Sequence, residues 1–147
     1  MSRASQERDI AQRLPMLTRI WRQLADALLV EFGVSNSTSW CLIWLDRLGP
    51  DVRQIDLAQA IGITQPSLVR LIDQLQQSGH VVRMQDPDDK RSNRVLLTDA
   101  GRELVGTIEA RLRDERAILF DGISDADIET TLRLIDTLST RIAERRV

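Results

Sequence analysis

The segment from Gln54 to Gly101 constrains the fold of this chain more than any other part of the sequence. Two short helical patterns, at 55–61 and 65–78, are separated by Gly62, which tolerates the positive φ of a tight turn. Ala58 is small enough for close helix contact, and Thr64 and Pro66 suit the first turn of the second helix. Apolar residues that can lock the pair are Leu57, Ile61, Ile63, Leu68 and Leu71. The pattern is typical of a helix-turn-helix, with an ordinary helical hairpin as the alternative.

A β-prone hairpin follows the second helix directly. A β-prone run with Val81, Val82 and Met84 leads into the polar stretch 86–94, and Val95-Leu-Leu97 returns from it. Thr98 can then cap another helix. A hairpin behind a helix-turn-helix is the layout of a winged helix. The sequence therefore predicts a mainly α fold with a small β-hairpin wing (α+β).

Helical patterns also lie on both sides of this segment. Apolar residues recur every three or four positions from Ile10 to Val30, and a second apolar helix is predicted from Trp40 to Leu48, with Ser37 and Thr38 as its caps. The last helix is predicted to begin after Ser124. No apolar run approaches the roughly 18 residues that cross a membrane, so no membrane association is expected.

Composition excludes several functions but does not by itself indicate nucleic-acid binding. The formal net charge is −2, without the basic excess usual in a nucleic-acid binder. The single cysteine, Cys41, excludes an intramolecular disulfide and fits a reducing cytoplasm, where we expect the protein. Together with the single histidine, His80, it also argues against a zinc site. No nucleotide-binding loop or nucleophile–base set is present, so we predict no enzyme, no metal and no cofactor.

The placement of particular side chains does favour double-stranded DNA as a partner. Gln and Arg side chains can pair with base edges in the major groove, and a basic wing can reach the backbone or the minor groove. An aspartate beside an arginine can orient that arginine by an ion pair. Cys41 lies in an apolar helix and is expected to be a buried hydrophobe, not a redox sensor. The predicted DNA-binding residues are Gln65, Ser67, Arg70, Gln74, Asp89, Lys90, Arg91 and Arg94.

The stretch AIGITQPSLVRLIDQLQQSGHVVR, followed by DPDDKRSNRVLLTDAG, resembles the MarR family of bacterial transcriptional regulators, most closely its SlyA-like branch. The family's wing signature corresponds to Asp89-Lys-Arg91 and Thr98-Asp-Ala-Gly101. The resemblance also takes in Arg19-Ile-Trp-Arg22 and Gly122-Ile-Ser124. It covers nearly the whole chain, and its wing and recognition-helix motifs are the specific part.

This resemblance implies a single domain over 1–147 that acts as a homodimer on a pseudo-palindromic operator. Residues 10–34 and 99–147 would form the helical dimerisation region, and 36–98 the DNA-binding winged lobe. Arg91 would enter the minor groove with Asp89 as its orienting partner. A small aromatic carboxylate is the expected effector, and the residues placed near its pocket are Arg19, Arg22, Trp40 and Trp44. The alternative function is a winged-helix module for protein–protein contact, which the balanced charge favours.

Overall fold

The computed structural model describes residues 2–50 and 52–145, in two compact units that comprise Met1–Leu112 and Arg113–Val147. The elements of the first unit are α1 (Arg3–Leu29), the 3-10 helix η1 (Val30–Phe32), α2 (Asn36–Leu48), α3 (Gln54–Ile61), α4 (Gln65–Gln77), β1 (Val81–Gln85) and β2 (Asn93–Leu97). Helix α5 (Asp99–Leu119) contributes residues to both units, and α6 (Asp125–Arg145) belongs to the second. The predicted class, a mainly helical fold with a small hairpin, is confirmed.

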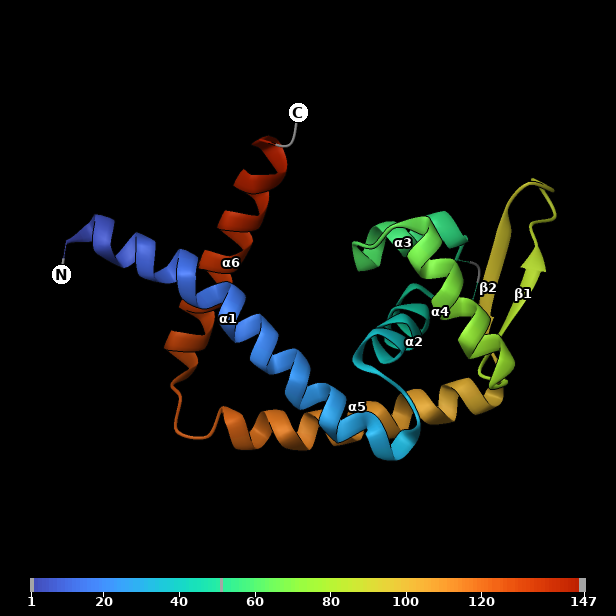
Figure 1. The fold of residues 1–147 in the computed structure, drawn as a ribbon, viewed down its shortest axis with the longest axis horizontal. Coiled ribbons are helices and arrows are strands. Elements are labelled where there is room, and N and C mark those ends of the chain that lie inside the picture. Colours follow the sequence, from blue (N-terminus) through green and yellow to red (C-terminus); the bar gives the residue numbers. More distant parts are fainter. Residues whose placement is uncertain (1, 51, 146–147) are drawn as a thin grey trace. The chain divides into compact units, whose positions relative to one another are not determined.

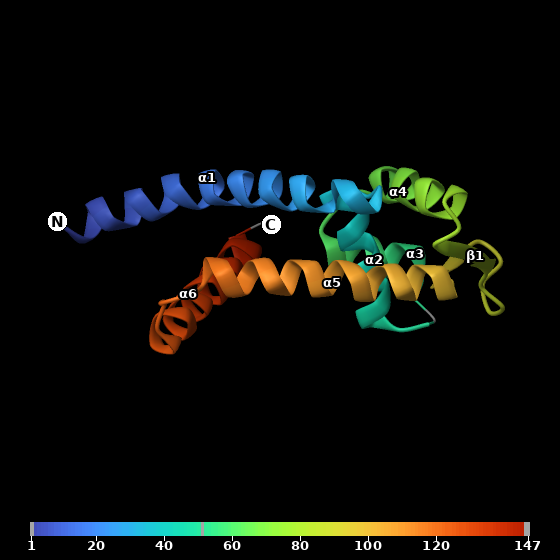
Figure 2. The same cartoon turned by 90° about the horizontal axis from the view of Figure 1, so that it is seen from below.

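Helix α2 forms the centre of the first unit. It contacts α1, α3, α4 and β2. It lies between α4 and the first half of α5 in Figure 1 and crosses that half of α5 in the view of Figure 2. Its side chains Cys41, Leu42 and Leu45 are buried, and they join one apolar cluster with Leu68 and Ile72 of α4. Burying one such aliphatic side chain contributes roughly 1.5–3 kcal/mol. This cluster therefore holds α4 in a fixed position on the lobe.

The start of α2 differs from the sequence prediction. The helix begins at Asn36 instead of Trp40, because Ser35 is its N-cap. The Ser35 Oγ accepts the Thr38 N–H at 3.2 Å, and the Ser35 N–H donates to the Thr38 Oγ1 at 2.8 Å. This reciprocal pair is a capping box. Thr38 therefore lies in the first turn, and the prediction of Ser37 and Thr38 as caps is wrong.

The hairpin is antiparallel, with Val81 opposite Leu97 and Gln85 opposite Asn93. Val81 and Val95 are buried, so one face of the hairpin packs on the core while the other faces solvent. A third segment extends the wing, because the Val95 N–H donates to the Val52 carbonyl oxygen at 3.1 Å and Arg53 forms a β-bridge with Arg94. The base of the wing is therefore tied to the start of α3.

The first turn of α5 lies against the start of the wing. The predicted cap is confirmed: the Thr98 Oγ1 accepts the Gly101 N–H at 3.0 Å and donates to the Gly79 carbonyl at 2.7 Å. The Thr98 N–H also donates to the His80 carbonyl oxygen at 3.0 Å. A Cβ at position 101 would lie 2.1 Å from that same oxygen, so only glycine fits there. Thr98 and Gly101 together fix α5 to the turn that precedes β1.

Helices α1 and α6 leave apolar side chains exposed. Only Ala25 and Leu29 are buried on α1, and among its described residues α6 has none buried. The exposed apolar residues of α1 include Ile10, Leu14, Met16, Leu17 and Ile20, and those of α6 include Leu132, Leu134, Ile135 and Ile142. Across the ranges 2–50 and 52–145, no helix combines the length and the apolar character that a membrane span requires.

Candidate nucleic-acid interface

The turn between α3 and α4 has the geometry of a helix-turn-helix. Gly62 ends α3 in the left-handed region with a φ of 78°, and its N–H donates to the Ala58 carbonyl at 3.0 Å. The Ile63 N–H donates to the same carbonyl at 3.1 Å. Leu57, Ala58 and Leu68 are buried at the contact between the helices. The turn and the small contact residue are where the sequence placed them.

The N-terminus of α4 is capped by Thr64, as predicted. The Thr64 Oγ1 accepts the Ser67 N–H at 3.3 Å and donates to the Ser67 Oγ at 2.9 Å. Pro66 lies in the first turn, where the absence of an N–H costs nothing. The Ser67 hydroxyl is therefore part of the cap, although Ser67 is exposed to solvent.

Helix α4 buries one side and exposes the other. Leu68, Ile72 and Leu75 face the core, whereas the four residues predicted to read DNA from this helix are all exposed. These four are Gln65, Ser67, Arg70 and Gln74. The exposed side thus presents amide and guanidinium groups on a rigid, packed helix, and these are groups that can pair with base edges in the major groove.

The wing is organised around a buried carboxylate. Asp86 is only 4% exposed, and its Oδ1 accepts the Asp88 N–H at 2.9 Å and the Arg94 Nη2–H at 3.3 Å. The Arg94 Nε lies 3.2 Å from the other oxygen of Asp86. The backbone hydrogen bond from Asp88, followed by the hydrogen bond from Arg94, lowers the pKa of Asp86. Arg94, which the sequence suggested as a DNA contact, therefore holds the wing together.

The tip of the wing has a hydrogen-bonded backbone and two basic side chains that reach solvent. The Asp89 Oδ1 accepts the Arg91 N–H at 2.9 Å, and the Gln85 amide donates to the Lys90 carbonyl at 2.9 Å. Lys90 and Arg91 are exposed. Within the described part of the chain, Asp89 contacts the backbone of Arg91 and not its guanidinium. In this structure Asp89 thus stabilises the loop backbone, and its orientation of the Arg91 side chain stays a prediction.

Two arginines that sequence reasoning overlooked also bind carboxylates of the lobe. Arg53 makes two hydrogen bonds to Asp56, at 2.7 and 3.2 Å. Arg83 donates to Asp73 of α4 at 2.5 Å. The i,i+3 spacing of Arg53 and Asp56 at a helix start was a usable signal. For Arg83 and Asp73 no local spacing gives the pairing, because it depends on how β1 packs against α4.

A crevice in the first unit is lined by three of the four residues predicted for the effector site. It has a volume of about 660 Å³, and its walls come from α1, α2, α3 and α4. Arg22, Trp40 and Trp44 line it, together with Ser67, Arg70 and Gln74 of α4. The Arg47 guanidinium lies 5.7 Å from the centroid of the Trp44 ring. Arg19 is not among the described residues that line this crevice.

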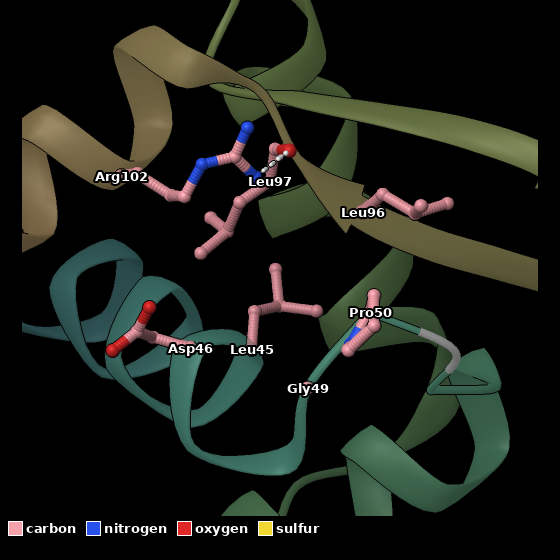
Figure 3. Close-up of a pocket in the computed structure, with 7 residues that line it drawn as sticks. All are labelled: Leu45, Asp46, Gly49, Pro50, Leu96, Leu97 and Arg102. Atoms are coloured by element: carbon pink, nitrogen blue, oxygen red, sulfur yellow. Dashed lines mark hydrogen bonds between the residues drawn. The ribbon is translucent and has the colours of Figure 1, made fainter.

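A second, smaller cavity lies at the end of α2. Its volume is about 160 Å³, and it is lined by Leu45, Asp46, Gly49, Pro50, Leu96, Leu97 and Arg102 (Figure 3). The Arg102 guanidinium donates to the Leu97 carbonyl at 3.0 Å and also pairs with Asp99. Ligand sites usually have volumes of about 300–1,000 Å³, so this cavity is too small for most organic ligands.

Cys41 is not placed for thiol chemistry. Cys41 is buried, and desolvation raises the pKa of its thiol to about 12. A reactive thiol requires a lowered pKa and exposure, so the expectation of a buried hydrophobe agrees with the geometry. Among the described residues, no group of three His, Cys, Asp or Glu side chains could hold a metal ion.

Known proteins with this arrangement are regulators. Residues 34–92 match the model of the MarR family. CouR from Rhodococcus jostii RHA1, solved with p-coumaroyl-CoA, is 25% identical, with a TM-score of 0.79 over 88% of this chain and 91% of that chain. The S. aureus MepR–DNA complex is 23% identical, with a TM-score of 0.77 over 88% and 94%. The transcriptional regulator SlyA is 19% identical, with a TM-score of 0.82 over 92% and 95%.

The helix-turn-helix and its wing give this protein the fold of a winged helix-turn-helix transcription regulator. More specifically, residues 34–92 match the MarR-family model, and the fold of solved MarR-family regulators extends over nearly the whole chain. The family predicted from the sequence is thus confirmed. Members of this family are transcription regulators and not enzymes, in agreement with the predicted function class.

Proposed function

We propose that the protein is a homodimeric regulator that reads a pseudo-palindromic DNA operator through α4 and the wing, and that a small aromatic carboxylate releases it. The observation that carries this proposal is the distribution of charge in the winged lobe. Four of its cations are paired with carboxylates: Arg47 with Glu109, Arg53 with Asp56, Arg83 with Asp73 and Arg94 with Asp86. Arg70, Lys90 and Arg91 have no ion pair within the described residues, and they lie on α4 and at the wing tip.

Such a distribution explains how a lobe of balanced charge can still bind DNA. In this proposal Arg70 and the glutamines of α4 contact base edges, and Arg70 is suited to a guanine because its guanidinium can donate two parallel hydrogen bonds. Lys90 and Arg91 contact the backbone or the minor groove beside the helix. The wing must keep its shape for both contacts to form together, and the buried Asp86–Arg94 pair supplies that shape.

Homodimerisation is supported by the exposed apolar residues of α1 and α6. A helix with no buried residue, such as the described part of α6, gains little from packing within its own chain. Apolar side chains exposed at this density usually lie in an interface. In a two-fold dimer the same surfaces pair with themselves, which would place two copies of α4 on half-sites about 34–36 Å apart.

The crevice beside α4 is the proposed effector site. Trp40 and Trp44 offer aromatic surface, and Arg22 and Arg70 offer two guanidinium groups for a carboxylate. Because Arg70 also belongs to the predicted DNA-reading set, a carboxylate bound to it would withdraw that side chain from the groove. Movement of α4 would also change the spacing of the two recognition helices in the dimer.

The decisive experiment sequences the genomic DNA fragments that the protein retains. The recovered fragment is then compared with a scrambled duplex in fluorescence anisotropy at about 150 mM salt. We expect a preference of at least about 10³-fold. Equal affinity for both duplexes would refute the proposal and favour a protein-binding winged helix.

Single variants separate the proposed roles. Arg70→Ala should cost about 1–3 kcal/mol at one base pair of each half-site and leave random DNA nearly unaffected. If Arg70→Ala weakens all duplexes equally, it contacts phosphate and not bases. Titration with benzoate- and cinnamate-type carboxylates tests release, and Arg22→Ala should abolish release while DNA affinity stays unchanged. Unchanged release by Arg22→Ala would remove Arg22 from the effector site.

A further inference from the structure

Arg83 binds the recognition helix at three points. Its Nη1–H donates to the Asp73 carboxylate at 2.5 Å and to the Gln76 Oε1 at 3.3 Å, and its Nη2–H donates to the Val69 carbonyl at 3.2 Å. Residues 69, 73 and 76 follow the i, i+4, i+7 spacing and therefore form one stripe along α4. A single guanidinium from β1, the strand that follows α4 in Figure 1, thus binds one side of the helix.

The pairing accounts for a carboxylate in an unfavourable place. Asp73 follows Arg70 by three positions on the exposed side of α4, and its side chain is 51% exposed. A negative charge there repels the phosphates that a recognition helix approaches, so electrostatics alone disfavours it. Arg83, whose side chain is 23% exposed, directs both terminal nitrogens at α4 instead of at solvent. Both terminal nitrogens of the Arg83 guanidinium therefore bind α4, so that Arg83 connects β1 to the recognition helix.

We propose that Asp73 and Arg83 form a clamp that sets the position of the wing relative to the recognition helix, and that this clamp determines how well one protomer discriminates its half-site. The inference rests on the proposed DNA binding. The strand β1 leads directly into the wing tip, so its attachment to α4 fixes the offset between Arg70 and Arg91. Arg83 and Asp73 are positioning residues, and neither needs to contact DNA.

The clamp and simple electrostatics predict opposite changes in operator affinity for one substitution. Asp73→Asn removes a negative charge beside the DNA, so charge alone predicts tighter binding to every duplex. Loss of a clamp predicts weaker binding to the operator, because helix and wing no longer contact it in register. We expect Asp73→Asn to weaken operator binding about three- to tenfold, the range for one partly exposed charge-assisted contact. Binding to random duplex should stay equal or become tighter.

The experiment measures operator and scrambled-duplex affinities for the full-length Asp73→Asn, Arg83→Gln and double variants. Both single variants should reduce discrimination to a similar extent, and the double variant should resemble either one, because the clamp is lost only once. Asp88→Asn is the matched control: it removes an exposed wing carboxylate whose ion pair with Arg94 is long, at 3.8 Å. It should leave discrimination unchanged. Circular dichroism melting checks that each variant is folded at the assay temperature.

The outcomes separate this inference from the proposed function. If the wild type itself shows no operator preference, the proposed function fails. If the wild type discriminates and Asp73→Asn binds the operator as tightly or more tightly with unchanged discrimination, the clamp is refuted and the proposed function stands. If Arg83→Gln weakens operator and random duplex alike and lowers the salt dependence by about one unit per site, Arg83 is a phosphate contact and the clamp is again refuted.

Discussion

Replacement of Gly101 by alanine tests the junction between α5 and the wing. An added methyl would lie 2.1 Å from the His80 carbonyl oxygen and 3.1 Å from its carbon. The obstacle is backbone and not a flexible side chain, so the first turn of α5 or the residues before β1 must move. The same oxygen accepts the Thr98 N–H, and any such movement also strains that hydrogen bond.

The expected destabilisation follows from opposing contributions. Inserting a methyl into a packed site costs about 1–3 kcal/mol, and weakening one hydrogen bond costs about 1 kcal/mol. Alanine gains about 1 kcal/mol over glycine inside a helix. The net effect should therefore be a loss of about 2 kcal/mol in the free energy of unfolding.

Gly106 provides the matched control for this prediction. It lies in the same helix, and a Cβ there meets nothing within 4 Å. Gly106→Ala should therefore stabilise the protein by up to about 1 kcal/mol. Urea unfolding of both variants at one fixed protomer concentration measures the difference, since stability of a dimer depends on concentration. A Gly101→Ala protein as stable as Gly106→Ala would show that the close approach to His80 does not constrain the fold.

Three further results are expected from the charges and the thiol. The two cations assigned to the DNA backbone, Lys90 and Arg91, doubled in a homodimer, should give operator binding a slope of about −4 in log affinity against log salt; a slope near −10 would mean that paired arginines also contact phosphate. Because the folded-state pKa of Asp86 is lowered, its stabilising contribution is complete above the ordinary aspartate pKa of about 3.9 and is lost as the pH falls through the lower folded value. Asp86→Asn should flatten the acid side of the stability curve there, and an unchanged curve would contradict the assigned hydrogen bonds. Cys41, buried and with its pKa raised to about 12, should resist iodoacetamide at pH 8 until urea unfolds the protein; rapid labelling of native protein would refute its burial.

Local sequence patterns were sufficient for the scaffold of the lobe. Gly62, Thr64 and Thr98 form their turn and cap hydrogen bonds with groups only a few residues away, so these roles follow from spacing alone. The exposed side of α4 was predicted from a core stripe of Leu68 and Leu71; in the structure Leu68 is buried together with Ile72 and Leu75, and Leu71 is half-buried. The cap of α2 was misplaced because Ser35, Ser37 and Thr38 are all competent caps. Only the reciprocal bond between Ser35 and Thr38 distinguishes them.

Side-chain pairing in the wing was beyond the reach of sequence reasoning. Residues 86–94 contain three acidic and three basic side chains, and which of them pair depends on the loop backbone. The pairing of Arg94 with Asp86 was not predicted, because it arises only after the hairpin has formed. Arg83 was overlooked because its partner, Asp73, belongs to another element. Both cases concern contacts made by tertiary packing and not by local spacing.

The pairing of most cations in the lobe also bears on how the regulator would be distributed among DNA sites. Genomic DNA offers an excess of non-specific sites, and a protein's affinity for them comes almost entirely from unneutralised cations. Four arginines of the lobe are paired with carboxylates of the same chain. Few unpaired cations are then left to bind non-specific sites, so less of the protein would be held on them. Occupancy of the operator then depends on the base contacts, and modest cellular amounts of the regulator would suffice to fill it.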